Sequence, residues 1–425
     1  MFKPTRFPMA LLVAALFAGC DDGIGPNSSN PGGAEFSRSA FERGDRGANE
    51  PFTVLTRNVY IGADIAPIFA ANGLVAISEA SAGVWAAVQS TDFEDRAAAL
   101  AEEIAEHRPR LVGLQEVARF ITLNAAFQPT GVLDFLEILI SEMEARGLTY
   151  QVIETQENTH ATLPIAYEPE PFKFTEWVDF IDRDVVLARS DVSIIDTDKG
   201  NYMADLEVIP GQVVLKRGWI RVDTEYRGKT FHFVNTHLEG QSLAPVQALQ
   251  LDELVGSVLA GLPGATVLVG DLNSDAEGGP GVLSWTPTYE ELIDNGFVDT
   301  WEQANPRSRD HGYTCCHDPD LMNLRSSLDQ RIDFVLIRTS EESVVPRLMV
   351  SVRAEVLGDE TEDLTDGGLW PSDHGGVLTT LRLDRGRHGE DRGRDRDDDD
   401  EDGESGRDPE DWRRGWDDDD GWRRH

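Results

Sequence analysis

Six short segments of the chain carry side chains that can bind metal ions, move protons or hold a phosphate. Carboxylates suit hard divalent cations, and a histidine paired with an aspartate can act as general acid or base near neutral pH. Asparagine can hold a phosphate oxygen without adding negative charge. The six segments are Thr56-Arg-Asn58, Gln115-Glu116, Asn235-Thr-His237, Gly270-Asp-Leu-Asn273, Arg331-Ile-Asp333 and Ser372-Asp-His374. Together these residue types fit the hydrolysis of a phosphoester.

Each segment has a simpler explanation when it is taken alone. An Asp-x-Asn sequence is usually a turn, and a single histidine in a strand is more often structural than catalytic. The ordered set is more informative, because five of the six segments end β-type runs and the Arg331 segment opens one. Rigid strand ends are where α/β and sandwich scaffolds mount active sites.

The order of the six segments resembles the motif series of the endonuclease/exonuclease/phosphatase superfamily, which includes DNase I-like nucleases and sphingomyelinase-like lipases. The resemblance extends from Asn58 to His374, and Gly270-Asp-Leu-Asn followed by Ser372-Asp-His is its most specific pair. It implies an α/β, or α+β, four-layered sandwich in which two mixed β-sheets pack face to face with helices on the outer faces.

The resemblance also implies a metal and phosphate site. Glu116 would be the principal metal ligand, with Asn58 beside it and Asp373 contributing, and the ion would be Mg²⁺ or else Mn²⁺ or Ca²⁺. Asn58, Asn235 and Asn273 would contact the phosphate.

Catalytic roles follow from the same resemblance. Asp271 and Asn273 would position the water and the scissile phosphate. His237 and His374 would flank that phosphate, and Asp333 would hydrogen-bond His374 and fix its tautomer.

In DNase I-like members a carboxylate also orients the first histidine. Asp182 is the candidate for this partner of His237, with Asp184 as the rival.

Hydrophobic periodicity predicts the elements that position these groups. Strands are expected over 52–60, 111–115 and 265–270, and a helix over 241–259. Thr91-Asp-Phe-Glu94 matches a capping box that opens a further helix, which Pro109 ends. The apolar face of that helix consists of Phe93, Ala97, Leu100, Ala101 and Ile104.

Three further stretches within the body allow alternative interpretations. About thirty residues separate Asn58 from the helix at Thr91, and 161–181 is rich in proline and aromatic residues. Both stretches either rim the cleft and set substrate choice or are surface elaboration. The Cys315-Cys316-His317-Asp318 cluster superficially suggests zinc, but adjacent cysteines are poor tetrahedral ligands, so a structural or reactive pair is favoured.

The two ends of the sequence differ in composition from the globular body, which is expected over residues 51–383. Residues 1–20 have a basic start, a short apolar run and Ala18-Gly-Cys20, which resembles a lipoprotein signal whose lipidated cysteine is Cys20. Simple secretion is the alternative. Residues 21–50 are expected to be a flexible linker, and 384–425 a disordered acidic and arginine-rich tail. We therefore expect an exported protein, anchored in the cell envelope or secreted, and monomeric.

The net charge of −39 narrows the choice of substrate. A strongly negative field repels nucleic acids at long range and argues against non-specific, high-affinity DNA binding. It does not exclude a nuclease, because a divalent ion reverses the local sign. The sequence thus predicts a phosphodiesterase that acts on nucleic acid or on phospholipid head groups. A phosphomonoesterase and a binding protein without catalysis are the alternatives, and glycoside hydrolysis leaves the histidines without roles.

Overall fold

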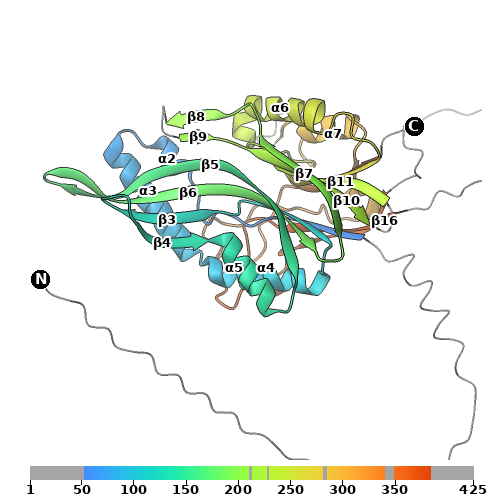
Figure 1. The fold of residues 1–425 in the computed structure, drawn as a ribbon, viewed down its shortest axis with the longest axis horizontal. Coiled ribbons are helices and arrows are strands. Elements are labelled where there is room, and N and C mark those ends of the chain that lie inside the picture. Colours follow the sequence, from blue (N-terminus) through green and yellow to red (C-terminus); the bar gives the residue numbers. More distant parts are fainter. Residues whose placement is uncertain (1–51, 210–212, 227–228, 281–284, 340–348, 384–425) are drawn as a thin grey trace, which may run out of the picture.

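The computed structural model describes residues 52–209, 213–226, 229–280, 285–339 and 349–383. Most strands of these residues belong to two large sheets (Figure 1). In order across it, the larger sheet contains β15 (Met349–Leu357), β16 (Gly376–Leu383), β1 (Phe52–Asn58), β2 (Leu111–Gln115), β6 (Phe172–Arg189), β3 (Arg119–Asn124) and β4 (Pro129–Asp134), with β5 (Tyr150–Pro169) paired to β6. The sheet is mixed, because β1 is parallel to β2 and antiparallel to β16.

The second large sheet is also mixed. Its strands, in order, are β13 (Val298–Asp299), β14 (Asp333–Thr339), β12 (Ala265–Asp271), β11 (Lys229–His237), β10 (Gly218–Tyr226) and β7 (Ser193–Asn201). β11 and β12 are parallel, and the other pairings are antiparallel. A separate ribbon is formed by β8 (Leu206–Ile209) and β9 (Val213–Leu215).

Three buried apolar clusters show how the layers are stacked. One cluster joins the inner faces of the two sheets, through residues such as Phe52, Leu111, Val186, Phe233 and Val267. The other two clusters cover the outer faces, one beneath α3, α4 and α5 and the other beneath α6 and α7 (Figure 1). The expected four-layered sandwich, with sheets face to face and helices outside, is therefore confirmed.

Each described helix has fewer residues than the longest strand, β5. They are α2 (Ala66–Ala70), α3 (Leu74–Ser90), α4 (Phe93–His107), α5 (Phe135–Ala145), α6 (Ala244–Glu253) with the π-helical turn Leu254–Val258, α7 (Thr288–Asp294) and α8 (Thr300–Ala304), and there are 3₁₀ turns at Gln241–Leu243 and Thr361–Asp363. No helix in the described ranges is both long enough and apolar enough to span a membrane.

The elements expected from periodicity are present, with one correction at a helix start. All five residues of the predicted apolar face of α4 are buried. Asp92, and not Thr91, is the N-cap, because the Asp92 side chain accepts a hydrogen bond from the backbone N–H of Asp95. The Thr91 hydroxyl instead donates to the backbone oxygens of Gly62 and Val88.

The two sheets approach each other closely around Gly113 in β2. A Cβ atom at this position would lie 2.6 Å from Oδ1 of Asn235 and 2.6 Å from Cγ2 of Val269, which both belong to the opposite sheet. Asn235 is fully buried and crosses this gap. Its Oδ1 accepts from Nε2 of Gln115 at 2.6 Å, and its Nδ2 donates to the backbone oxygens of Leu114 and Val185.

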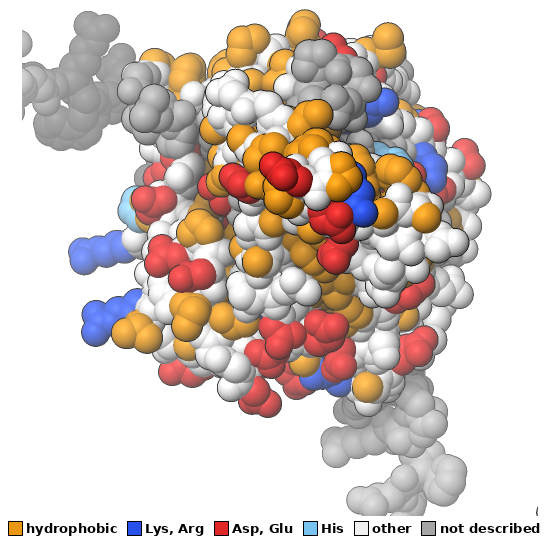
Figure 2. Space-filling model, turned by 90° about the vertical axis from the view of Figure 1, so that its left-hand side faces the viewer, with side chains coloured by type: hydrophobic (Ala, Val, Ile, Leu, Met, Phe, Trp, Pro, Cys, Tyr) orange, Lys and Arg blue, Asp and Glu red, His pale blue; other side chains and the backbone are white. Residues whose placement is uncertain are grey.

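The proline- and aromatic-rich stretch forms the outer part of the long β5–β6 hairpin, which projects from the body (Figure 1). Tyr167, Phe172, Phe174 and Trp177 are in successive ring contacts there, and Phe127 packs on Trp177. Phe172 and Phe127 are 50% and 57% exposed. Figure 2 views the molecule from this end and shows apolar side chains in the middle of the face with acidic side chains around them.

Three sequence predictions concern residues outside the described ranges: the signal segment with Cys20, the linker 21–50 and the tail 384–425. They stay predictions.

Candidate active site

The predicted catalytic residues converge because strand ends from the two sheets meet at one edge of the sandwich. Asn58 ends β1 and Glu116 follows β2, its parallel neighbour. In the opposite sheet, His237 and Asp271 end the parallel strands β11 and β12 and lie opposite each other. Asp333 begins the antiparallel strand β14, also opposite Asp271. Register therefore aligns the groups within each sheet, and the packing of the two sheets brings the two sets together.

Asn58 connects carboxylates from the two sheets. Its Nδ2 lies 3.1 Å from Oε1 of Glu116 and 3.1 Å from Oδ2 of Asp271, and its Oδ1 accepts from the backbone N–H of Tyr60. The amino group, not the oxygen, faces the acids, so the predicted metal-ligand role of Asn58 does not fit this orientation. Glu116 has a left-handed backbone with φ of 59°, which is uncommon outside glycine. Its Oε2 accepts from the backbone N–H of Ile61 at 2.8 Å.

His374 has the aspartate partner that the resemblance implied. Its Nδ1 donates to Oδ2 of Asp333 at 2.8 Å, which leaves Nε2 directed at Oδ2 of Asp271 (3.8 Å) and Oδ1 of Asp373 (3.9 Å). Burial lowers the pKa of His374, but the carboxylates of Asp333, Asp373 and Asp271 outweigh burial and raise it well above its usual range. His374 is therefore an imidazolium at neutral pH.

His237 has the opposite environment. Its Nδ1 lies 3.0 Å from Nη1 of Arg217, and guanidinium groups only donate, so Nδ1 accepts and the ring proton is on Nε2. That Nε2 lies 3.4 Å from Oδ2 of Asp271. Burial, and then the charge of Arg217, lower the pKa of His237 well below its usual range. His237 is therefore a neutral imidazole.

The structure places Arg217, rather than a carboxylate, at Nδ1 of His237. Asp182, the predicted partner, lies behind Arg217, with its Oδ2 3.8 Å from Nη1. Glu239 accepts from Nη2 of Arg217 at 3.4 Å. The rival candidate, Asp184, is fully buried and accepts from Asn158 at 2.9 Å. Sequence reasoning missed Arg217, since nothing in the motif series marks it.

The two other asparagines have different positions. Asn273 lies at the site, with its Nδ2 donating to the backbone oxygen of Leu238 at 3.1 Å and its backbone N–H donating to Oδ1 of Asp271. Asn235 is engaged entirely by the contacts between the sheets described above, so we assign it a structural role in place of the predicted phosphate contact.

Two buried arginines hold the loops of the site and were not predicted. Arg96 donates to the backbone oxygens of Val59, Tyr60 and Pro371, which flank Asn58 and Ser372. Arg57 donates to the backbone oxygen of His374 and to Glu103. Arg96 carried a sequence signal, because it lies three residues after Phe93 on the apolar face of α4.

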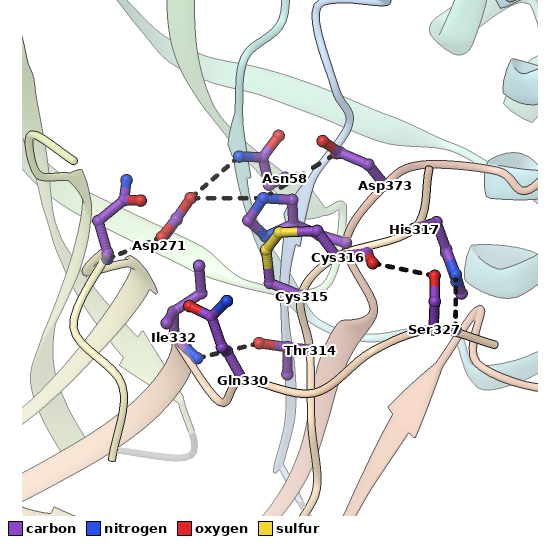
Figure 3. Close-up of a disulfide and its surroundings, with 12 residues drawn as sticks. Asn58, Asp271, Thr314, Cys315, Cys316, His317, Ser327, Gln330, Ile332 and Asp373 are labelled. Atoms are coloured by element: carbon purple, nitrogen blue, oxygen red, sulfur yellow. Dashed lines mark hydrogen bonds and ion pairs between the residues drawn. A yellow bond between two sulfur atoms is a disulfide. The ribbon is translucent and has the colours of Figure 1, made fainter. Parts of the chain in front are cut away.

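The cysteine pair lies beside His374. Cys315 and Cys316 form a disulfide (Figure 3). The backbone of Cys315 also forms isolated β-bridges with Gln330 and with His374. The backbone N–H of Gly375 donates to the oxygen of Thr314 at 2.7 Å. The segment with the cysteines thus supports the loop that contains His374, which agrees with the predicted structural role of the pair.

The donor set fits a divalent cation. Burial raises the pKa of Asp271 to about 7 and that of Asp373 to about 6, since buried carboxylates crowd one another here. Within the described ranges, Oδ1 of Asp333 is buried without a hydrogen-bond partner, and Asp271, Asp333 and His374 offer ligand atoms within 4.8 Å of one another. Carboxylate oxygens are what Mg²⁺ prefers. Glu116 and Asp373 would hold the ion, which would polarise the phosphate and offset its charge.

The sequence matches the Endonuclease/Exonuclease/phosphatase family over residues 84–374. The chain belongs to this family. Members of this family hydrolyse phosphoesters, and they generally use divalent metals. No curated protein sequence matches the chain.

Several solved structures resemble the fold. A family protein from Leptotrichia buccalis C-1013-b is 14% identical, with 78% of this chain and 100% of that chain covered and a TM-score of 0.48. One from Beutenbergia cavernae DSM 12333 is 21% identical, with 78% and 72% covered and a TM-score of 0.49. The mannosyl-6-phosphatase Bt3783 of Bacteroides thetaiotaomicron VPI-5482 is 17% identical, with 78% and 100% covered and a TM-score of 0.45.

Asp333→Asn tests the charge on His374. Removing the Asp333 carboxylate should lower the pKa of His374, because the pair favours the imidazolium. The pairing of His374 adds to the free energy of unfolding in full below the pKa of histidine in the unfolded chain, about 6.5. This contribution is lost as the pH rises through the raised pKa of His374 in the folded protein. NMR titration of the ring protons in EDTA-treated protein measures the shift. An unchanged pKa of His374 would contradict the assignment.

Arg217→Gln tests the neutral state of His237. Loss of the guanidinium charge should raise the pKa of His237, although burial continues to lower it. Arg221→Gln, in β10, is the matched control, because Arg221 pairs with Asp198 and Asp223. NMR titration should show the rise only in Arg217→Gln, and equal pKa values in both variants would refute the role of Arg217.

Proposed function

We propose that this chain hydrolyses phosphodiesters with a divalent cation, Mg²⁺ or alternatively Mn²⁺ or Ca²⁺. The observation that carries the proposal is the placement of His237 and His374 on either side of Asp271, with the Arg217 cation at Nδ1 of His237 and the Asp333 carboxylate at Nδ1 of His374. Both Nε2 atoms face the same Oδ2, at 3.4 Å and 3.8 Å. Paired groups whose environments separate their pKa values are typical of acid–base sites.

The side chains supply the parts of an in-line displacement. Asp271, whose pKa of about 7 suits a base at neutral pH, takes the proton of the attacking water as its oxygen bonds to phosphorus. The bond from phosphorus to the leaving oxygen breaks, and the His374 imidazolium gives that oxygen its proton. His237 and Asn273 donate hydrogen bonds to the phosphoryl oxygens, whose charge grows in the transition state. Proton exchange with solvent then returns Asp271 and His374 to their starting protonation states.

Two substrate classes follow from this reaction, nucleic acid and phospholipid head groups. One surface observation favours the lipid. The aromatic cluster of the β5–β6 hairpin, in which Phe172 is exposed and the other rings are partly exposed, is suited to the interface of a bilayer, where aromatic rings are enriched. The charge of −39 opposes unassisted binding of nucleic acid.

His374→Ala tests catalysis on the full chain with Mg²⁺, Mn²⁺ or Ca²⁺. The substrates are bis-p-nitrophenyl phosphate, plasmid DNA, RNA, sphingomyelin and phosphatidylcholine. Loss of the imidazolium should lower kcat by about 10²–10⁴-fold, which is the usual contribution of a general acid. His311→Ala is the control, because His311 is exposed and paired with Glu277.

EDTA should abolish turnover by the wild type, and the preferred substrate separates nuclease from lipase. Hydrolysis of a further substrate, the monoester p-nitrophenyl phosphate, without hydrolysis of any of the diesters would indicate a phosphomonoesterase. No turnover by a folded protein that binds Mg²⁺ would indicate a binding protein.

We also propose that the enzyme is exported and anchored through Cys20. The support is the sequence Ala18-Gly-Cys20 after a short apolar run. Labelled palmitate should enter the wild type and not Cys20→Ser, and the variant should leave the membrane fraction. Labelling of both proteins, or of neither, would contradict the anchor.

A further inference from the structure

A pocket of about 420 Å³ adjoins the catalytic carboxylates. Its volume is within the range of pockets that bind small molecules. Glu116 lines the pocket and is also in contact with Asn58 at the active site. A substituent attached to the reacting phosphate can therefore extend into this pocket, and the lining decides which substituent is accepted.

The pocket has an excess of negative charge. Four carboxylates line it, those of Asp64, Glu116, Asp182 and Glu239. Among the lining residues that the structure describes, Arg217 is the only cation, and it lies 3.4 Å from Glu239 and 3.8 Å from Asp182. Burial raises the pKa of Asp182 only to about 6, so its carboxyl group is mostly ionised at pH 7. Coulomb attraction therefore favours a positively charged occupant.

Two of these carboxylates are enclosed and incompletely hydrogen-bonded. Oδ1 of Asp182 and Oε2 of Glu239 are buried, and neither has a hydrogen-bond partner among the described residues. A ligand in the pocket cannot contact atoms that are so enclosed, but their charge acts over several ångströms where water is excluded. Buried charge without full compensation is costly. A cation in the adjoining pocket would offset this charge without a direct hydrogen bond.

The rest of the lining is mainly apolar and includes two aromatic rings. Phe69 comes from the stretch before α4, and Phe180 comes from the stretch 161–181, so the cleft-rim interpretation fits both. Aromatic faces attract cations, and quaternary ammonium groups in particular, whereas a primary ammonium is strongly hydrated and needs hydrogen-bond acceptors. Further apolar lining residues are Ile65, Leu206, Val208 and Leu243.

We propose, on the basis of the proposed function, that this pocket binds a quaternary ammonium group of the substrate, so that the enzyme selects choline esters of phosphate over neutral and anionic diesters. Sphingomyelin, phosphatidylcholine and glycerophosphocholine all contain this group. The carboxylates of the pocket disfavour nucleic acid, because they repel the phosphates next to the reacting one.

Matched esters test the selection on the full chain with Mg²⁺. p-Nitrophenyl phosphorylcholine is compared with p-nitrophenyl 3,3-dimethylbutyl phosphate, in which a carbon atom replaces the ammonium nitrogen and the shape is kept. The choline ester should have a kcat/KM at least about tenfold higher, because only its charge is attracted by the carboxylates and the aromatic rings. The primary ammonium ester, p-nitrophenyl phosphorylethanolamine, should react more slowly than the choline ester.

Two pocket variants should each reduce the preference for the choline ester. Asp64→Asn removes an exposed carboxylate, and Phe69→Leu replaces a ring by an aliphatic side chain. Asp294→Asn is the control and should keep the preference, because Asp294 is exposed at the end of α7 and does not line the pocket. Choline should inhibit the wild type competitively and more strongly than 3,3-dimethylbutanol does, a result that does not depend on the folding of a variant.

Equal kcat/KM for the choline ester and its carbon analogue would overturn the pocket assignment, as would an unchanged preference in both pocket variants. Faster hydrolysis of the ethanolamine ester, or of thymidine 5′-(p-nitrophenyl phosphate), would also overturn it. Failure to cleave any of these diesters, bis-p-nitrophenyl phosphate included, would instead overturn the proposed function. Where the preference holds, sphingomyelin in vesicles and soluble glycerophosphocholine distinguish a lipid source of the choline group from a soluble one.

Discussion

The main physical constraint on this structure is the concentration of carboxylates where two β-sheets meet. Asp182, Asp184 and Asp271 are buried and Asp373 is partly buried at one edge of the sandwich, and burial raises the pKa of each one. The protein offsets this charge in part with Arg217 and with the His374 imidazolium. The remaining negative charge suits a divalent cation. The same uncompensated charge that destabilises the buried carboxylates would therefore bind the ion.

The two histidines show how local charge decides function. They are equally inaccessible, but one faces three carboxylates and the other faces a guanidinium. Nδ1 of His374 therefore donates to Asp333, whereas Nδ1 of His237 accepts from Arg217. A sequence shows both as histidines after a strand, and only the packing distinguishes them.

The fold and most of the site could be predicted from the sequence because they depend on local signals. Strand periodicity gave β1, β2 and β12, and motif order gave Glu116, Asp271 and the Asp333–His374 pair. The rest depends on side chains from distant elements. Arg217 lies outside every motif, and Asn235 has a motif position but spans the sheets instead of facing the site. The orientation of the Asn58 amide also depends on a contact made by folding, the N–H of Tyr60.

The close approach at Gly113 affects which sequences this enzyme can tolerate. Gly113 has no chemistry of its own, and its neighbours in β2 are ordinary apolar residues. A side chain there would push apart the strands that carry Asn58 and Asp271, which must stay at hydrogen-bonding distance. A side chain at Gly113 could therefore be accepted only if Asn235 or Val269 moved, so the spacing between the sheets limits this position although it takes no part in the chemistry.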